Sequence, residues 1–272
     1  MEKKVIVITG GTSGIGRAIA LQLSGEGHTV YATTRAVHPT PTLEGFTLIT
    51  LDLNSDASIH AAMQQVISVE GRIDVLINNA GSGMAGAVED ATTEETFRLF
   101  QTNVFGLLTC CRAVIPQMRA QGSGKIINIS SLAANFGLPF RGIYSASKSA
   151  IERFSETMRM ELAQWNIYVS IVQPGDFHTN INANRQVAAR GFTGASPFHK
   201  VFTEQYKRIS DDVLKAKNPV LVARVVSKIV AAPKPKINYP VATLVQKLSI
   251  VLNRILPRAW FQRMLTARYP VK

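Results

Sequence analysis

A glycine-rich turn near the beginning of the chain is the feature that most constrains its fold. The turn, Thr9-Gly10-Gly11-Thr12-Ser13-Gly14-Ile15-Gly16, follows a short apolar run and opens a segment with helical periodicity. In such a unit, glycines allow a tight turn and let the backbone approach a pyrophosphate, while the helix N-terminus supplies partial positive charge. We therefore expect a dinucleotide to bind against residues Gly10, Thr12, Ser13, Gly14, Ile15 and Gly16.

Short runs rich in Val and Ile alternate with helical patterns, which is typical of a parallel sheet covered by helices on both faces. Strands are predicted at residues 5–9, 29–33, 46–51, 75–78, 125–130, 168–173 and 236–239. Helices are predicted at residues 14–26, 56–70, 93–120 and 144–164, with another capped by Asn218 and carrying Pro219 in its first turn. This order predicts an α/β fold, a doubly wound parallel sheet of the Rossmann type in a single domain. Residues 1–240 would form the dinucleotide-binding domain, and residues 241–272 a helical C-terminal extension of it.

Composition narrows the class of protein. With 272 residues, 46% of them hydrophobic, the chain can bury a full core. Cys110 and Cys111 are adjacent in an apolar helical stretch, so we expect reduced core thiols of a cytoplasmic protein. The five histidines have no ligand spacing, and no metal site is expected. Neither a signal peptide nor a membrane-spanning helix is expected, because the apolar runs are too short.

The net charge of +12 comes entirely from the C-terminal part of the chain. Residues 1–212 contain 18 Lys or Arg and 18 Asp or Glu, whereas the last 60 residues contain twelve cations and no acid. The basic, amphipathic extension could cap the substrate opening, contact a second subunit, or attach to an anionic membrane surface. Our hypothesis is peripheral membrane association. No specific nucleic-acid binding is expected, since the chain contains no recognised module for it.

A Tyr-x-x-x-Lys pair supplies candidate acid–base chemistry. Residues four apart share a helix face, so the Lys148 ammonium can stand beside the Tyr144 phenol and lower its pKa from about 10. The phenol could then exchange a proton close to neutral pH. Such a pair is common by chance, but here it lies thirteen residues after Ser131 and far downstream of the glycine turn. Together these elements indicate a hydride-transfer site.

The motifs together resemble the short-chain dehydrogenase/reductase family, of the single-domain type, over almost the whole chain. The turn has the family's Gly-x-x-x-Gly-x-Gly spacing, and Asn78-Asn79-Ala80-Gly81 matches its Asn-Asn-Ala-Gly motif. The residues that match its catalytic tetrad are Asn103, Ser131, Tyr144 and Lys148. The resemblance implies further cofactor contacts from Asp52, Leu53, Asn79, Ala80, Gly81, Tyr144, Lys148, Pro174, Gly175 and Thr179.

The resemblance also implies a reaction. A hydride passes between a nicotinamide and a carbonyl carbon, while Tyr144 donates a proton to the developing alkoxide. Ser131 would hold that oxygen, and Asn103 would anchor a water that relays protons. Lys148 would bind the nicotinamide ribose and lower the pKa of Tyr144. The neighbouring Ser130 lacks the family spacing, and we expect its hydroxyl to bond to nearby backbone.

The end of the second predicted strand distinguishes between the two nicotinamide cofactors. A site for NAD(H) would carry an Asp or Glu there to bond the adenosine ribose. This chain reads Val30-Tyr31-Ala32-Thr33-Thr34-Arg35 instead. Because a guanidinium can pair with the 2′-phosphate, we expect Arg35 to bind it and NADP(H) to be preferred over NAD(H).

The sequence constrains the substrate less. Residues 176–217 contain several aromatic and aliphatic side chains suited to an apolar cleft or lid. With the C-terminal extension, the pattern resembles the branch that contains 17β-hydroxysteroid dehydrogenases, retinol dehydrogenases and keto-lipid reductases. We expect an apolar ketone or alcohol: a steroid, a retinoid or a long-chain keto-lipid such as 3-ketosphinganine. The family also implies a homodimer or homotetramer through the two long helices. The alternative is a non-catalytic NADP(H)-binding redox sensor that acts through its basic tail.

Overall fold

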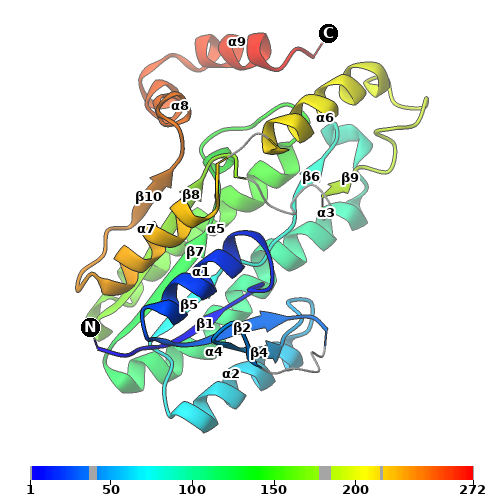
Figure 1. The fold of residues 1–272 in the computed structure, drawn as a ribbon. Coiled ribbons are helices and arrows are strands. Elements are labelled where there is room, and N and C mark those ends of the chain that lie inside the picture. Colours follow the sequence, from blue (N-terminus) through cyan, green and yellow to red (C-terminus); the bar gives the residue numbers. More distant parts are fainter. Residues whose placement is uncertain (1, 37–41, 178–184, 215–216, 272) are drawn as a thin grey trace.

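An eight-stranded sheet forms the centre of the computed structural model, which describes residues 2–36, 42–177, 185–214 and 217–271 (Figure 1). The strand order is β10-β8-β7-β5-β1-β2-β4-β3. The strands are β1 (Val5–Ile8), β2 (Thr29–Thr34), β3 (Thr42–Leu43), β4 (Phe46–Thr50), β5 (Val75–Asn78), β7 (Gly124–Ile129), β8 (Ile167–Pro174) and β10 (Asn238–Val241). All pair in parallel except β3, which pairs antiparallel with β4. The seven predicted strands are thus confirmed, with ends shifted by at most two residues.

Helices cover both faces of the sheet. One face carries α1 (Gly14–Gly25) and α7 (Val220–Ala231), and the other carries α2 (Asp56–Glu70), α4 (Gly106–Gln121) and α5 (Gly142–Glu161) (Figure 1). Side chains of β1 alternate between the two cores: Val5 and Val7 pack towards α2 and α4, whereas Ile6 and Ile8 pack towards α1 and α7. The predicted doubly wound α/β fold is confirmed. The order of the strands reverses at β1, because β2 is added on one side of β1 and β5 on the other. A crevice therefore forms at the carboxyl ends of these strands.

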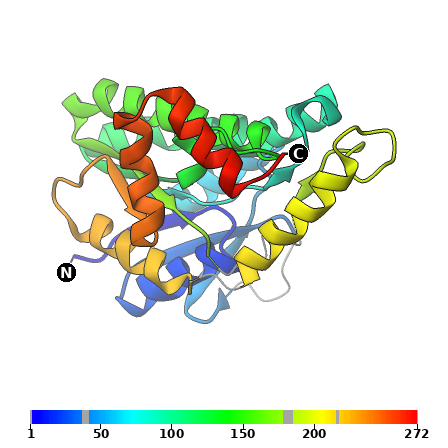
Figure 2. The ribbon, with the colours of Figure 1, turned by 90° about the horizontal axis from the view of Figure 1, so that it is seen from above.

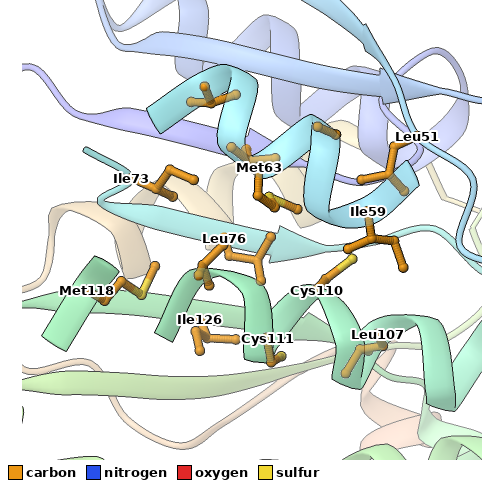
Figure 3. Packing of buried hydrophobic residues seen from close by; sticks show 14 of the residues in the cluster. Leu51, Ile59, Met63, Ile73, Leu76, Leu107, Cys110, Cys111, Met118 and Ile126 are labelled. Carbon is orange, nitrogen blue, oxygen red and sulfur yellow. The ribbon is translucent and has the colours of Figure 1, made fainter. Parts of the chain in front are cut away.

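Figure 3 shows the core between α2 and α4, which contains both cysteines. Cys110 and Cys111 are free and buried, in agreement with the expected core thiols. Burial raises the pKa of both thiols. Both sulfurs therefore stay protonated and pack as small apolar groups.

The long helix predicted at residues 93–120 is confirmed as a continuous helical stretch, Thr93–Gln121. It consists of α3 (Thr93–Phe100), a π-helical turn (Gln101–Phe105) and α4. The sequence does not predict the π-helical turn within it. By length and composition, Thr93–Gln121 is the one helix in the described ranges that could cross a membrane. However, half of its most apolar part is buried in the protein, where α4 packs on α2, β5 and β7. These contacts are those of a core helix.

Three helices lie beyond the carboxyl ends of the strands (Figures 1 and 2): α6 (His199–Leu214), α8 (Leu244–Ile255) and α9 (Arg258–Arg268). The break between α8 and α9 falls at Leu256-Pro257. A two-stranded parallel sheet, β6 (Met84–Ala85) with β9 (Gln186–Val187), lies at the same end. The sequence predicts neither of these short strands.

Candidate active site

A cavity of about 630 Å³ lies at the carboxyl ends of the parallel strands. Predicted residues that form its wall are Gly10, Thr12, Ser13, Gly14, Ile15, Arg35, Asp52, Leu53, Asn79, Ala80, Gly81, Ser131, Tyr144, Lys148, Pro174 and Gly175. Gly16 and Asn103 lie behind the wall, and Thr179 lies outside the described residues. The structure therefore brings most of the predicted site together in one cavity.

The glycine turn is shaped by two positive backbone angles. Gly10 and Gly14 have φ values of 67° and 54°, a region that favours glycine. A Cβ atom at Gly16 would overlap the Gly10 carbonyl oxygen and the side-chain amide of Asn79. Gly16 therefore supports the turn by close packing rather than by facing the cavity, while the turn leaves room for a pyrophosphate at the start of α1.

Thr9 joins the first and fourth predicted strands beneath this turn. Its Oγ1 accepts hydrogen bonds of 3.0 Å from the backbone N–H groups of Asn79 and Ala80. In return, Asn79 Nδ2 donates to the carbonyl oxygens of Thr9 and Gly10, both at 3.0 Å. The Asn-Asn-Ala-Gly motif thus holds the two crevice-forming loops in a fixed relation.

The guanidinium of Arg35 lies at the part of the cavity formed by the ends of β2 and β4. Thr33 Oγ1 accepts a 3.1 Å hydrogen bond from Gly10 N and so belongs to the turn, whereas Arg35 is exposed in the cavity wall. In the part of the chain that the structure describes, Arg35 forms no ion pair. Asp52 also lines this end, and its Oδ1 accepts a 3.0 Å hydrogen bond from Asn54 N. The end of β2 therefore offers a cation, and not a carboxylate, where the two cofactors differ.

Tyr144 and Lys148 lie in the first two turns of α5, and Ser131 follows β7. The Ser131 hydroxyl faces the Tyr144 phenol and, as a hydrogen-bonding group, lowers its pKa, while Ser131 Oγ also accepts a 3.2 Å hydrogen bond from Ala133 N. Lys148 Nζ donates to the Ile129 carbonyl oxygen at 3.0 Å and lies 6.0 Å from the centroid of the Tyr144 ring. Burial lowers the pKa of Lys148 to about 8, against the opposing effect of the Glu152 carboxylate. The geometry matches an acid–base pair oriented by a serine.

The electrostatics of Tyr144 differ from the prediction. Burial raises its pKa; the Ser131 hydrogen bond and the charges of Arg141 and Arg185 act in the opposite direction. Lys148, whose ammonium is bonded to a backbone carbonyl, is not among the groups that shift it. The prediction that Lys148 lowers the pKa of Tyr144 is therefore wrong for this structure, where burial dominates.

Asn103 sits on the π-helical turn and is almost completely buried. Its Oδ1 accepts a 2.9 Å hydrogen bond from Ser82 N, and its Nδ2 donates to the Ser82 carbonyl at 3.0 Å and to Ser147 Oγ at 3.2 Å. A Cβ atom at Gly81 would come within 3.0 Å of Asn103 Oδ1 and 3.5 Å of Lys148 Nζ. Asn103 thus positions the Gly81–Ser82 backbone beside Lys148, and π-helical turns are frequent at functional sites.

Ser130 takes part in a buried carboxylate network. Its hydroxyl donates to Glu152 Oε1 at 2.8 Å, as does Gln173 Nε2. The expectation of a backbone partner is therefore wrong, because Glu152, one helical turn after Lys148, projects towards the end of β7. Burial raises the pKa of Glu152, while these two donors lower it. The spacing Tyr144, Lys148, Glu152 on one helix face could have indicated this residue from sequence.

The C-terminal extension packs beside the cavity. Gln246 Nε2, on α8, donates to Asp176 Oδ2 at 2.7 Å, and Asn253 Nδ2 donates to the Asn135 carbonyl at 3.0 Å. On α9, the ring of Phe261 meets that of Phe136 edge-on, with centroids 5.0 Å apart. These contacts hold α8 and α9 against neighbouring segments at the carboxyl ends of the strands (Figure 2).

Residues 4–189 match the model of the short chain dehydrogenases. The chain belongs to the short-chain dehydrogenase family. The chain is 38% identical, over the full length of both proteins, to a 3-ketodihydrosphingosine reductase of Bacteroides thetaiotaomicron. It is 32% identical to human 17-beta-hydroxysteroid dehydrogenase type 1, over 88% of this chain and 77% of that one. A short-chain dehydrogenase from Streptomyces avermitilis has the same fold, with a TM-score of 0.81, 30% identity and 98% coverage of both chains.

Human retinol dehydrogenase 8 is also 31% identical, over 86% of this chain and 80% of that one. These relatives confirm the family and its keto-lipid, steroid and retinoid branch. A solved short-chain dehydrogenase/reductase from Burkholderia phymatum is in complex with NAD, and a metagenomic short-chain oxidoreductase, 29% identical with a TM-score of 0.70, is in complex with NADP. The chain is therefore a short-chain dehydrogenase of the oxidoreductase class that acts on CH–OH and C=O groups.

Proposed function

We propose that the protein is an NADP(H)-dependent oxidoreductase that interconverts a ketone and a secondary alcohol on an apolar lipid, with Tyr144 as general acid and base. The observation that carries this proposal is the meeting of Ser131, Tyr144 and the buried ammonium of Lys148 in one cavity wall, with Lys148 Nζ 6.0 Å from the Tyr144 ring centroid. A long-chain keto-lipid, the class to which 3-ketosphinganine belongs, is the favoured substrate class. The full-length similarity to a 3-ketodihydrosphingosine reductase supports this choice over a steroid or a retinoid.

Each site residue has a task in this proposal. The nicotinamide, when bound, supplies or takes the hydride. Ser131 holds the carbonyl oxygen and Tyr144 donates its proton to that oxygen; the raised pKa keeps the proton on Tyr144 until charge develops. Lys148 binds the nicotinamide ribose, and Arg35 pairs with the adenosine 2′-phosphate.

The extension suggests where the reaction takes place. Apolar side chains with 45% or more of their surface exposed lie on α8 and α9, among cations and without any acid: Leu244, Val245, Leu248, Val251, Ile255, Trp260 and Met264. A basic helix with an exposed apolar face suits the surface of an anionic membrane. We propose that the enzyme works in the cytoplasm, attached peripherally to the membrane that dissolves its substrate.

The test is NADPH oxidation with a panel of ketones: 3-ketosphinganine, a steroid, retinal and a short acetoacetyl ester. We expect turnover of one class, reduced by about 100-fold or more in Tyr144→Phe because the proton donor is lost. Tyr168→Phe, which removes a phenol on β8 outside the cavity wall, is the matched control. Equal activity of Tyr144→Phe and wild type would refute the proposed role. Tight NADPH binding without any turnover would favour the redox-sensor alternative.

A further inference from the structure

Two arginines lie in the cavity wall beside Tyr144, and neither forms an ion pair with another described residue. They are Arg141 and Arg185, and the positive charge of each lowers the pKa of Tyr144. Arg141 Nε and Arg185 Nη1 are buried atoms with no hydrogen-bond partner in the described structure. Unpaired buried donors of this kind carry a desolvation cost that a ligand can offset.

Each arginine is fixed by a neighbouring aromatic side chain. The Arg185 guanidinium lies over the ring of Tyr206 on α6, 5.7 Å from its centroid, and Tyr206 raises the pKa of Arg185. The Arg141 guanidinium lies 5.4 Å from the ring centroid of Tyr269, after α9. Arg185 also directly precedes β9, which is paired with β6, and Arg141 directly precedes α5. The two cations are therefore held at defined positions at the edge of the catalytic centre.

The charge around the pair is positive. Burial, followed by the charge of Arg141, lowers the pKa of Arg185, while Tyr206 and Tyr144 raise it. Asp176 also lines the cavity, where it raises the pKa of Tyr144 and accepts a hydrogen bond from Gln246, so two arginines stand against one carboxylate here. Residues 178–184, which lie outside the described structure, contain no Asp or Glu.

We propose that Arg141 and Arg185 form a subsite for an anionic group of the substrate, close to the reacting carbonyl. Guanidinium groups bind the oxygens of carboxylate, sulfonate and phosphate through charge-assisted hydrogen bonds, and this oxyanion chemistry is shared by all three. This inference rests on the proposed reductase function and narrows its substrate: a long-chain ketone with an acidic headgroup is favoured over the cationic 3-ketosphinganine.

The test compares headgroups on one alkyl chain. The substrates are a long-chain β-keto phosphonate, the matching β-keto sulfonate, the neutral dimethyl ester of the phosphonate, and 3-ketosphinganine. For wild-type protein with NADPH, we expect a KM for the anions about tenfold or more below that of the neutral ester, as expected for one or two charge-assisted contacts. The phosphonate and the sulfonate together distinguish a doubly from a singly charged oxyanion. Equal KM values for the anions and the ester, or a preference for 3-ketosphinganine, would overturn the subsite while leaving the reductase proposal intact.

Variants locate the effect. Arg185→Gln and Arg141→Gln should each raise the KM for the anions about tenfold and leave the KM for the ester and the KM for NADPH unchanged. Because both arginines also act on the pKa of Tyr144, any change in kcat should be the same for the anions and the ester. Arg208→Gln, on the exposed side of α6, removes the same charge and should change none of these values. A similar rise for ester and anions, or a loss confined to kcat, would contradict a binding role.

Calorimetric titration of the β-keto phosphonate into the NADPH complex keeps the subsite testable if no ketone is turned over. Binding that is lost in both variants would support the subsite even if the proposed reaction failed. Absence of binding by the wild-type protein would overturn the subsite.

Discussion

The Lys148 ammonium determines one limb of the expected pH dependence. Burial lowers its pKa to about 8, so the group loses its charge as the pH rises through that value, whereas Tyr144, with a raised pKa, stays protonated there. We expect kcat/KM for NADPH-dependent reduction to be constant below about pH 7 and to fall above about pH 8. A pH series of initial rates measures this. Lys148→Arg, which does not titrate in this range, should lack the limb; a limb that persists in the variant would assign it to another group.

Arg35 is the residue on which the cofactor preference depends. Replacing the exposed guanidinium with a carboxylate in Arg35→Glu removes the partner of the 2′-phosphate and repels it. We expect the ratio of kcat/KM for NADPH to that for NADH to fall by about 10- to 100-fold, the range of a charge-assisted hydrogen bond. Arg98→Glu, an exposed position on α3, is the control and should keep the ratio. An unchanged ratio in Arg35→Glu would place the 2′-phosphate elsewhere.

At the scale of residues, motif spacing predicted those that share one local segment. Ser131, Tyr144 and Lys148 come together because a strand end and a helix start meet at one sheet edge. Arg141 and Arg185 were not predicted, since their proximity depends on the chain returning from β8 through β9. The pKa of Tyr144 could not be predicted either, because burial is a property of the folded surroundings.

At the scale of elements, α8 can be tested as a membrane contact. Leu244 and Leu248 are 86% and 53% exposed on this basic helix. The double variant Leu244→Glu/Leu248→Glu should reduce partitioning onto anionic vesicles by about tenfold or more, since burying each leucine is worth about 1.5–3 kcal/mol. Co-sedimentation with phosphatidylglycerol vesicles measures it. The control is Val69→Glu on α2, where the side chain is 69% exposed. Equal partitioning of the two proteins would contradict the membrane interpretation.

The element predictions succeeded where periodicity is strong. The buried strands and the amphipathic helices follow from their apolar patterns. The π-helical turn at Gln101–Phe105 shares its apolar periodicity with the flanking helices, so no pattern in the sequence separates it. Two-residue strands such as β3, β6 and β9 exist only through tertiary pairing, and composition carries no signal for them.

At the scale of the whole molecule, the outer face of α3 to α5 is open to a second copy. Phe97, Phe105 and Phe154 are 58%, 43% and 42% exposed, while the described contacts of α8 and α9 are with the cavity edge. We expect a homodimer or homotetramer in which this face is buried. Phe105→Glu/Phe154→Glu should give monomers in size-exclusion chromatography with light scattering. Leu221→Glu, on α7 across the sheet, should keep the wild-type mass; a monomeric wild-type protein would contradict this interface.

The position of the extension is the part of the whole molecule that sequence left open. Its helices and their break at Leu256-Pro257 follow from periodicity and proline. Its place beside the cavity depends on single contacts, such as that of Gln246 with Asp176, between segments about 70 residues apart. Hydrophobic periodicity indicates that a helix forms, but it does not indicate which distant side chain that helix contacts.

The two buried cysteines provide a natural probe of how often the domain opens. Cys110 and Cys111 are the only cysteines of the chain, and both are enclosed between α2, α4 and the sheet (Figure 3). Because both thiols are buried, a thiol-reactive dye can reach them only when these layers separate. No other thiol in the chain contributes to the signal. The rate at which native protein is labelled therefore reports how often the domain opens, with no engineered probe and no denaturant.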